Sequence, residues 1–104
     1  MTLSQNSLNK IKTYVGFGIK SGKVIFGTDN ILLNKKIKVV LYDPRLSQNA
    51  LDKISRHGAE WGYEIIALED IPAVTHKENC KVIGLKKGGL TDQVIKILED
   101  TNNI

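Results

Sequence analysis

Four short apolar runs alternate along this chain with stretches of helical periodicity, and this alternation limits the folds that the sequence can adopt. The runs cover residues 23–27, 38–43, 63–68 and 81–85, and they are rich in β-branched side chains. Strands that alternate with helices imply a parallel or mixed sheet covered by helices on both faces. The sequence therefore predicts an α/β fold, a three-layer α-β-α sandwich around a small, mixed, mostly four-stranded sheet.

The first two helical stretches have recognisable boundaries. Ser7 is the expected N-cap of a first helix, whose apolar side chains recur every three or four residues and which ends near Gly22. Thr28 or Asp29 is the expected cap of a second helix that reaches Lys35 or Lys36.

Three further helices are expected in the second half of the chain. Ser47 can cap a helix that has Trp61 on its inner side and ends at Gly62. A short helix is expected over residues 69–75, followed by a loop over 76–80, and a last helix is expected from Thr91.

The length and composition favour one domain over residues 1–104. The sequence shows no repeat, low-complexity stretch or linker, and its longest apolar runs fall far short of the roughly 18 residues that span a membrane. Cys80 is the only cysteine, so no internal disulfide can form, and we expect it to be a buried or half-buried structural residue. A cytoplasmic, monomeric protein without metal or cofactor is the expectation.

Positive charge is concentrated in the first part of the chain. Residues 1–40 contain seven lysines and a single acid, Asp29, whereas the remaining residues contain eight bases and ten acids. A basic segment of this kind suits a polyanion-binding face, although a lysine-rich solvated surface has the same composition.

Three segments resemble a known family of ribosomal proteins. Residues 14–27 are similar to the pattern "LGLAxRAGKxxxG" near the start of its bacterial members, residues 38–43 to its central strand, and residues 82–90 to a later stretch of the YlxQ-like branch. The family contains the L-seven-A-e and L-thirty-e types. The resemblance implies an α-β-α sandwich that binds kink-turns or related structured RNA, with ribosomal RNA or ribosomal proteins as partners.

The resemblance also implies where RNA would be bound. Family members use the start of the second helix, with the pattern glycine, small residue, asparagine, glutamate, two residues and lysine. Gly27 and Thr28 fit this pattern, whereas Asp29, Asn30 and Leu33 replace its last three specified residues. An N-cap role is the alternative for Asp29, and we expect Leu33 to pack rather than to contact RNA.

The second contact region of the family corresponds to the polar loop 76–80. His76 can stack on a base, or it is simply solvated. The predicted RNA-binding residues combine this loop, the second helix and the neighbouring lysines; they are Lys20, Lys23, Gly27, Thr28, Asp29, Asn30, Lys35, Lys36, His76 and Lys77.

Patterns that would indicate an enzyme are missing from the sequence. There is no Walker-type phosphate loop, no dinucleotide fingerprint after a strand and no nucleophile elbow. We therefore predict no catalytic residues. The leading hypothesis is a non-catalytic RNA-binding accessory protein. The alternative is a protein-interaction module on the same fold that has lost kink-turn recognition, which the replacements at Asp29 and Leu33 favour.

Overall fold

The computed structural model describes residues 4–102, in which helices and strands alternate as the sequence predicts. The elements in chain order are α1 (Gln5–Lys20), β1 (Val24–Phe26), α2 (Thr28–Leu32), β2 (Ile37–Tyr42), α3 (Gln48–Trp61), β3 (Glu64–Ala67), α4 (Ile71–Thr75), β4 (Val82–Lys86) and α5 (Gly89–Asn102). None of the helices in residues 4–102 is both long enough and apolar enough to cross a membrane.

The four strands form one mixed sheet in the order β1-β4-β2-β3. Strand β4 runs antiparallel to both β1 and β2, and β2 runs parallel to β3. The last strand therefore inserts between the first and the second. This arrangement brings residues 23–27 beside residues 82–86, which are distant in the sequence.

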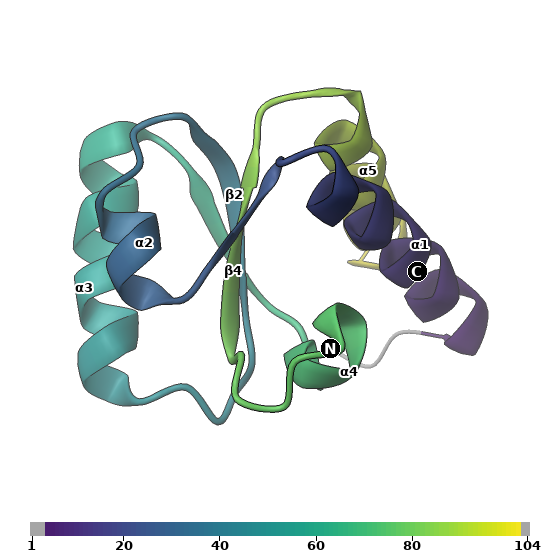
Figure 1. Ribbon diagram of the computed structural model, residues 1–104, viewed down its shortest axis with the longest axis horizontal. Coiled ribbons are helices and arrows are strands. Elements are labelled where there is room, and N and C mark those ends of the chain that lie inside the picture. Colours follow the sequence, from purple (N-terminus) through teal and green to yellow (C-terminus); the bar gives the residue numbers. More distant parts are fainter. Residues whose placement is uncertain (1–3, 103–104) are drawn as a thin grey trace.

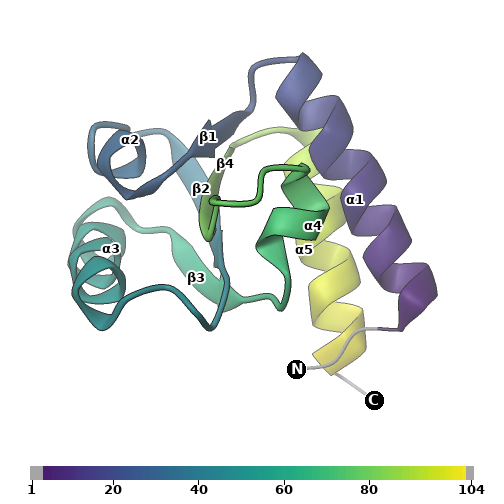
Figure 2. The same cartoon turned by 60° about the horizontal axis from the view of Figure 1, so that its bottom comes forward.

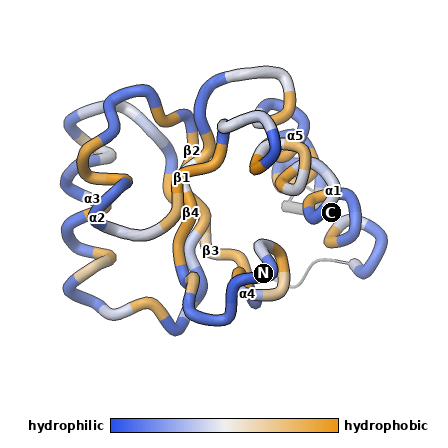
Figure 3. The backbone as a smooth tube through the Cα atoms, in the orientation of Figure 1, coloured by the Kyte–Doolittle hydropathy of each residue, from blue (hydrophilic) through white to orange (hydrophobic). Residues whose placement is uncertain are grey.

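Helices cover both faces of the sheet, which confirms the three-layer prediction (Figures 1 and 2). Helices α1, α4 and α5 lie on one face, where Ile11, Val39, Ile83 and Leu98 belong to the larger buried cluster. Helices α2 and α3 lie on the other, where the smaller cluster includes Val40. Hydrophobic residues dominate along the strands, whereas hydrophilic and hydrophobic residues are interspersed along the helices (Figure 3).

Several predicted helix boundaries were wrong. Helix α1 begins earlier than expected because Ser4, not Ser7, is its N-cap, with the Ser4 side chain accepting a hydrogen bond from the Ser7 amide at 3.1 Å. Helix α2 stops at Leu32 because Asn34 forms a turn, in which its side chain accepts from the Lys36 amide at 2.9 Å.

The exposure of Trp61 on α3 and the start of α5 also differ from expectation. Ser47 and Gly62 cap α3 as predicted, but Trp61 is 41% exposed and not on the inner side of the helix, where the Tyr63 ring packs against Gly58 instead. Helix α5 begins at Gly89 rather than Thr91, since the Gly88 carbonyl already accepts a helical hydrogen bond from the Asp92 amide.

Candidate functional site

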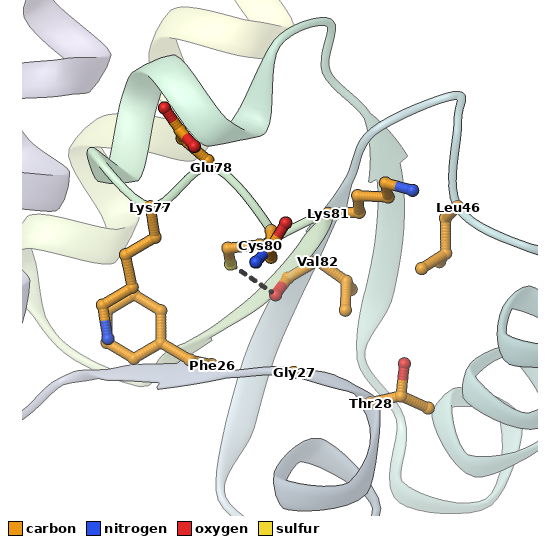
Figure 4. Close-up of a pocket in the computed structure, with 10 residues that line it drawn as sticks. Phe26, Gly27, Thr28, Leu46, Lys77, Glu78, Cys80, Lys81 and Val82 are labelled. Carbon is orange, nitrogen blue, oxygen red and sulfur yellow. Dashed lines mark hydrogen bonds between the residues drawn. The ribbon is translucent and has the colours of Figure 1, made fainter.

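A groove of about 550 Å³ opens where β1 passes into α2, opposite the loop that precedes β4 (Figure 4). One wall comes from the end of β1 and the start of α2, and the other from the loop and the first residues of β4. Leu46, which follows β2, completes the lining. The lining residues are Phe26, Gly27, Thr28, Leu46, Lys77, Glu78, Asn79, Cys80, Lys81 and Val82.

Gly27 makes the turn from strand to helix at the centre of this groove. Its backbone has a φ of 86°, which favours glycine, and its amide donates to the Val82 carbonyl at 3.2 Å. A side chain at this position would meet no atom within 4 Å, so the space above the backbone is open. The turn therefore exposes main chain that a ligand could approach closely.

The opposite wall is held by contacts within the loop and across the groove. The Nζ of Lys77 lies 4.0 Å from the centre of the Phe26 ring. The Cys80 amide donates to the Lys77 carbonyl at 3.0 Å, and the half-buried Cys80 thiol lies 3.4 Å from the Val82 carbonyl oxygen. Cys80 thus has the structural setting that we expected.

A buried carboxylate, that of Asp43, holds the start of α4, the helix that leads into this loop. Asp43 is almost fully buried, and its side chain accepts from the Arg45 guanidinium through two hydrogen bonds and from the Ile71 amide at 3.2 Å. These contacts, led by the side-chain hydrogen bond from Arg45, hold the pKa of Asp43 well below its usual range. The anionic side chain therefore ties the end of β2 to the start of α4.

The three residues in and directly after α2 that differ from the family pattern, Asp29, Asn30 and Leu33, are exposed. Asp29 is not the N-cap, because Gly27 occupies that position; Asp29 lies exposed in the first turn. The Asn30 amide donates to the Phe26 carbonyl at 2.9 Å. Leu33 is 82% exposed, so the expectation that it packs was wrong, because α2 ends before Leu33 can turn inward.

The structure divides the predicted site residues between two ends of the sheet. Gly27, Thr28 and Lys77 line the groove, and His76, which is exposed with a φ of 59°, precedes its second wall. Four predicted lysines lie instead at the opposite end, before β1 and β2; they are Lys20, Lys23, Lys35 and Lys36.

The sequence-based prediction of the site missed residues at both ends of the sheet, in the groove and among the lysines opposite it. Lys81 and Leu46 join the groove, and Lys86 and Lys87 join the lysines at the far end. The antiparallel pairing of β4 with both β1 and β2 brings these residues into place. The alternation of strands and helices carries no signal for that pairing.

The described residues offer no grouping typical of a metal site. Within residues 4–102, no three side chains of His, Cys, Asp or Glu are placed to hold an ion together. The groove instead combines open backbone with a hydroxyl, an amide, a thiol, one carboxylate, an aromatic ring and two lysines.

Comparisons with known proteins identify the fold. Models of known protein families and curated protein sequences give no match to this chain. Solved structures do match. A protein of unknown function from Bacillus halodurans superposes with a TM-score of 0.75 at 12% identity, over 86% of this chain and 96% of the other.

A second solved structure has a stated binding activity. The 15.5kD RNA binding protein of Giardia lamblia superposes with a TM-score of 0.68 at 13% identity, over 99% of this chain and 94% of the other. At these identities the likeness shows a shared fold. The chain therefore shares the α-β-α fold of the Giardia and Bacillus proteins.

Proposed function

We propose that this chain is a non-catalytic RNA-binding protein that holds a structured RNA, a kink-turn or a close relative of one, in the groove. The observation that carries the proposal is that two segments far apart in the sequence form the opposite walls of one groove. They are the same two segments that contact RNA in the family that the sequence resembles. The fold shared with the Giardia protein supports the same ligand class.

The chemistry of the groove suits an irregular RNA. The open backbone at Gly27 lets a nucleotide come close, and the Thr28 hydroxyl offers a hydrogen-bonding group. Lys77 and Lys81 are both exposed and can contact phosphates on the two sides of the bound nucleotide. Unpaired bases of a bent RNA present the edges and faces that such a site can read. The proposed partner is a structured RNA, either ribosomal RNA or another kink-turn-like RNA.

The test is the salt dependence of binding to a kink-turn RNA and to a simple duplex. Removal of both groove lysines in Lys77→Ala/Lys81→Ala should flatten the slope of log K against log salt by about one unit for each lost contact. The matched control is Lys53→Ala/Lys96→Ala, which removes the same charge from exposed positions on α3 and α5. Equal slopes for the two double variants, or no binding by wild type at low salt, would contradict the proposal.

A second candidate function, docking of a protein partner, is favoured by Leu33. Its side chain is 82% exposed directly after α2, where family members carry a lysine. A leucine there gives no attraction to phosphate but suits an apolar contact. Failure of wild type to bind either RNA, together with loss of a co-purifying ribosomal protein in Leu33→Lys, would favour this second function.

A further inference from the structure

Seven lysines come together at the end of the sheet opposite the groove, a surface that we call the basic end. All of them lie near the start of β1, near the start of β2 or near the end of β4. They are Lys20 and Lys23 at β1, Lys35, Lys36 and Lys38 at β2, and Lys86 and Lys87 at β4. The loops before β1 and β2 and after β4 gather at the upper side of Figure 1.

Strand pairing accounts for this gathering. Because β4 is antiparallel to its two neighbours, its last residue lies beside the first residues of both. The Lys86 amide donates to the Lys23 carbonyl at 2.9 Å, and Lys86 is paired with Ile37 on the other side. A bulge between Ile37 and Val39 then leaves Lys38 exposed.

The charge of this surface is largely uncompensated. All seven lysines are exposed except Lys86, which is half-buried. Glu60, Glu64 and Asp92 lie on neighbouring elements, near the end of α3, at the start of β3 and in the first turn of α5, but within residues 4–102 no lysine of the basic end forms an ion pair. The surface therefore attracts an anionic chain with several regularly spaced charges.

An exposed aromatic ring lies at the same end of the sheet. Trp61 ends α3 just before β3, and β3 runs parallel to β2, so Trp61 lies level with the residues that precede β2. The Nζ of Lys35 is 5.0 Å from the centre of the Trp61 ring. A partly exposed tryptophan beside lysines is a combination that binds unpaired nucleotides, since the ring stacks on a base while the ammonium groups hold phosphates.

We infer that the basic end is a second RNA-binding surface, at which an unpaired base stacks on Trp61 and the lysines contact the neighbouring phosphates. This inference shares the ligand class of the proposed function but uses none of the groove residues. The two surfaces are separated by the length of β4, or roughly 13 Å at the usual rise per residue. A single RNA held in the groove can therefore extend to the basic end.

The sequence supplies a direct probe, because Trp61 is the only tryptophan. Titration of the whole protein with an oligouridylate at low salt should quench its fluorescence. Inorganic polyphosphate, which has charge but no bases, should compete with the oligouridylate without the same quenching. Equal quenching by polyphosphate, or no quenching by an oligouridylate that anisotropy shows to be bound, would overturn the stacking.

Variants separate the two surfaces. Trp61→Ala should weaken binding of a labelled oligouridylate by about fivefold or more, and Trp61→Tyr should retain most of the affinity. Lys35→Ala/Lys36→Ala should flatten the salt slope by about 1.4 units if both contact a single strand. Lys77→Ala/Lys81→Ala should leave the quenching of Trp61 unchanged even if kink-turn binding is lost. Unaltered affinity in a folded Trp61→Ala protein would refute the second surface, whatever the groove binds.

Discussion

The ammonium group of Lys77 lies 4.0 Å from the centre of the Phe26 ring, and this contact joins the two walls of the groove. Phe26 ends β1 directly before Gly27, whereas Lys77 belongs to the loop between α4 and β4. A cation–π contact at an exposed site stabilises by about 0.5–1 kcal/mol. That is enough to favour one position of a short loop without making it rigid.

Replacement of the ring should therefore loosen the loop more than the fold. Phe26→Leu keeps an apolar side chain but removes the π face, so we expect faster amide hydrogen exchange over residues 77–80 and a loss of no more than a few kcal/mol in unfolding free energy. The control is Phe17→Leu, because Phe17 is exposed on α1, away from the groove. Identical exchange of the loop in both variants would show that the Phe26 ring does not hold it.

A charge at the centre of the sheet should unfold the protein. Val40 is fully buried on β2 between the sheet and helices α2 and α3. Val40→Asp would bury a carboxylate without a partner, at a cost of several kcal/mol that is comparable with the whole stability of a small domain. Lys38→Asp, an exposed change on the same strand, should stay folded in denaturant titration. A stable Val40→Asp protein would contradict the position of β2 in the sheet.

The contribution of Tyr63 to the free energy of unfolding should be lost at alkaline pH. Its hydroxyl donates to the Ile54 carbonyl at 3.0 Å and lies 2.8 Å from Nδ1 of His57. Because a hydroxyl has one proton to donate, Nδ1 of His57 must be the donor in its contact with Tyr63.

Burial raises the pKa of Tyr63 to about 12, above the usual value of about 10 in an unfolded chain. The unfolded state thus loses its proton first, and the stability due to neutral Tyr63 is full below about pH 10 and is lost as pH rises toward 12. Denaturant titrations at several pH values should show this decline in wild type and a shallower one in Tyr63→Phe. If the unfolding free energy declines equally with pH in both proteins, groups other than Tyr63 cause the loss of stability at alkaline pH.

Local patterns were sufficient to predict the order of elements, but not which strands pair. Ser47 and Gly62 mark the ends of α3 because capping depends on residues that are close in sequence. The insertion of β4 between β1 and β2 depends on contacts between distant residues, so its consequences were missed. Lys23 and Gly27 are close in the sequence and were placed in one site, yet they flank β1 at its opposite ends. The exposure of Leu33 and Trp61 likewise depends on where a helix stops and on what lies beneath it.

The three residues in and directly after α2 that differ from the family pattern provide a gain-of-function prediction. Asp29 and Leu33 are exposed, and Gly27 rather than Asp29 caps the helix, so neither replacement disturbs the core or the cap. Asn30→Glu removes the hydrogen bond to the Phe26 carbonyl, at a cost of about 1 kcal/mol in stability.

The triple variant Asp29→Asn/Asn30→Glu/Leu33→Lys should bind a standard kink-turn at least ~10-fold more tightly than wild type, equivalent to about 1.4 kcal/mol. Asp29→Asn removes a negative charge that would face phosphate, and Leu33→Lys adds a positive one. Asn30→Glu supplies a carboxylate that can accept from a base amino group, a contact worth roughly 1–3 kcal/mol in the DNA case. Leu33→Lys alone is the control, since added charge by itself should strengthen binding to a kink-turn and to a simple duplex alike. Calorimetric titration of wild type and variants against both RNAs distinguishes the outcomes. Tight, selective kink-turn binding by wild type would show that the three replacements do not weaken the site. A folded triple variant without any gain in affinity would show that α2 does not face the RNA.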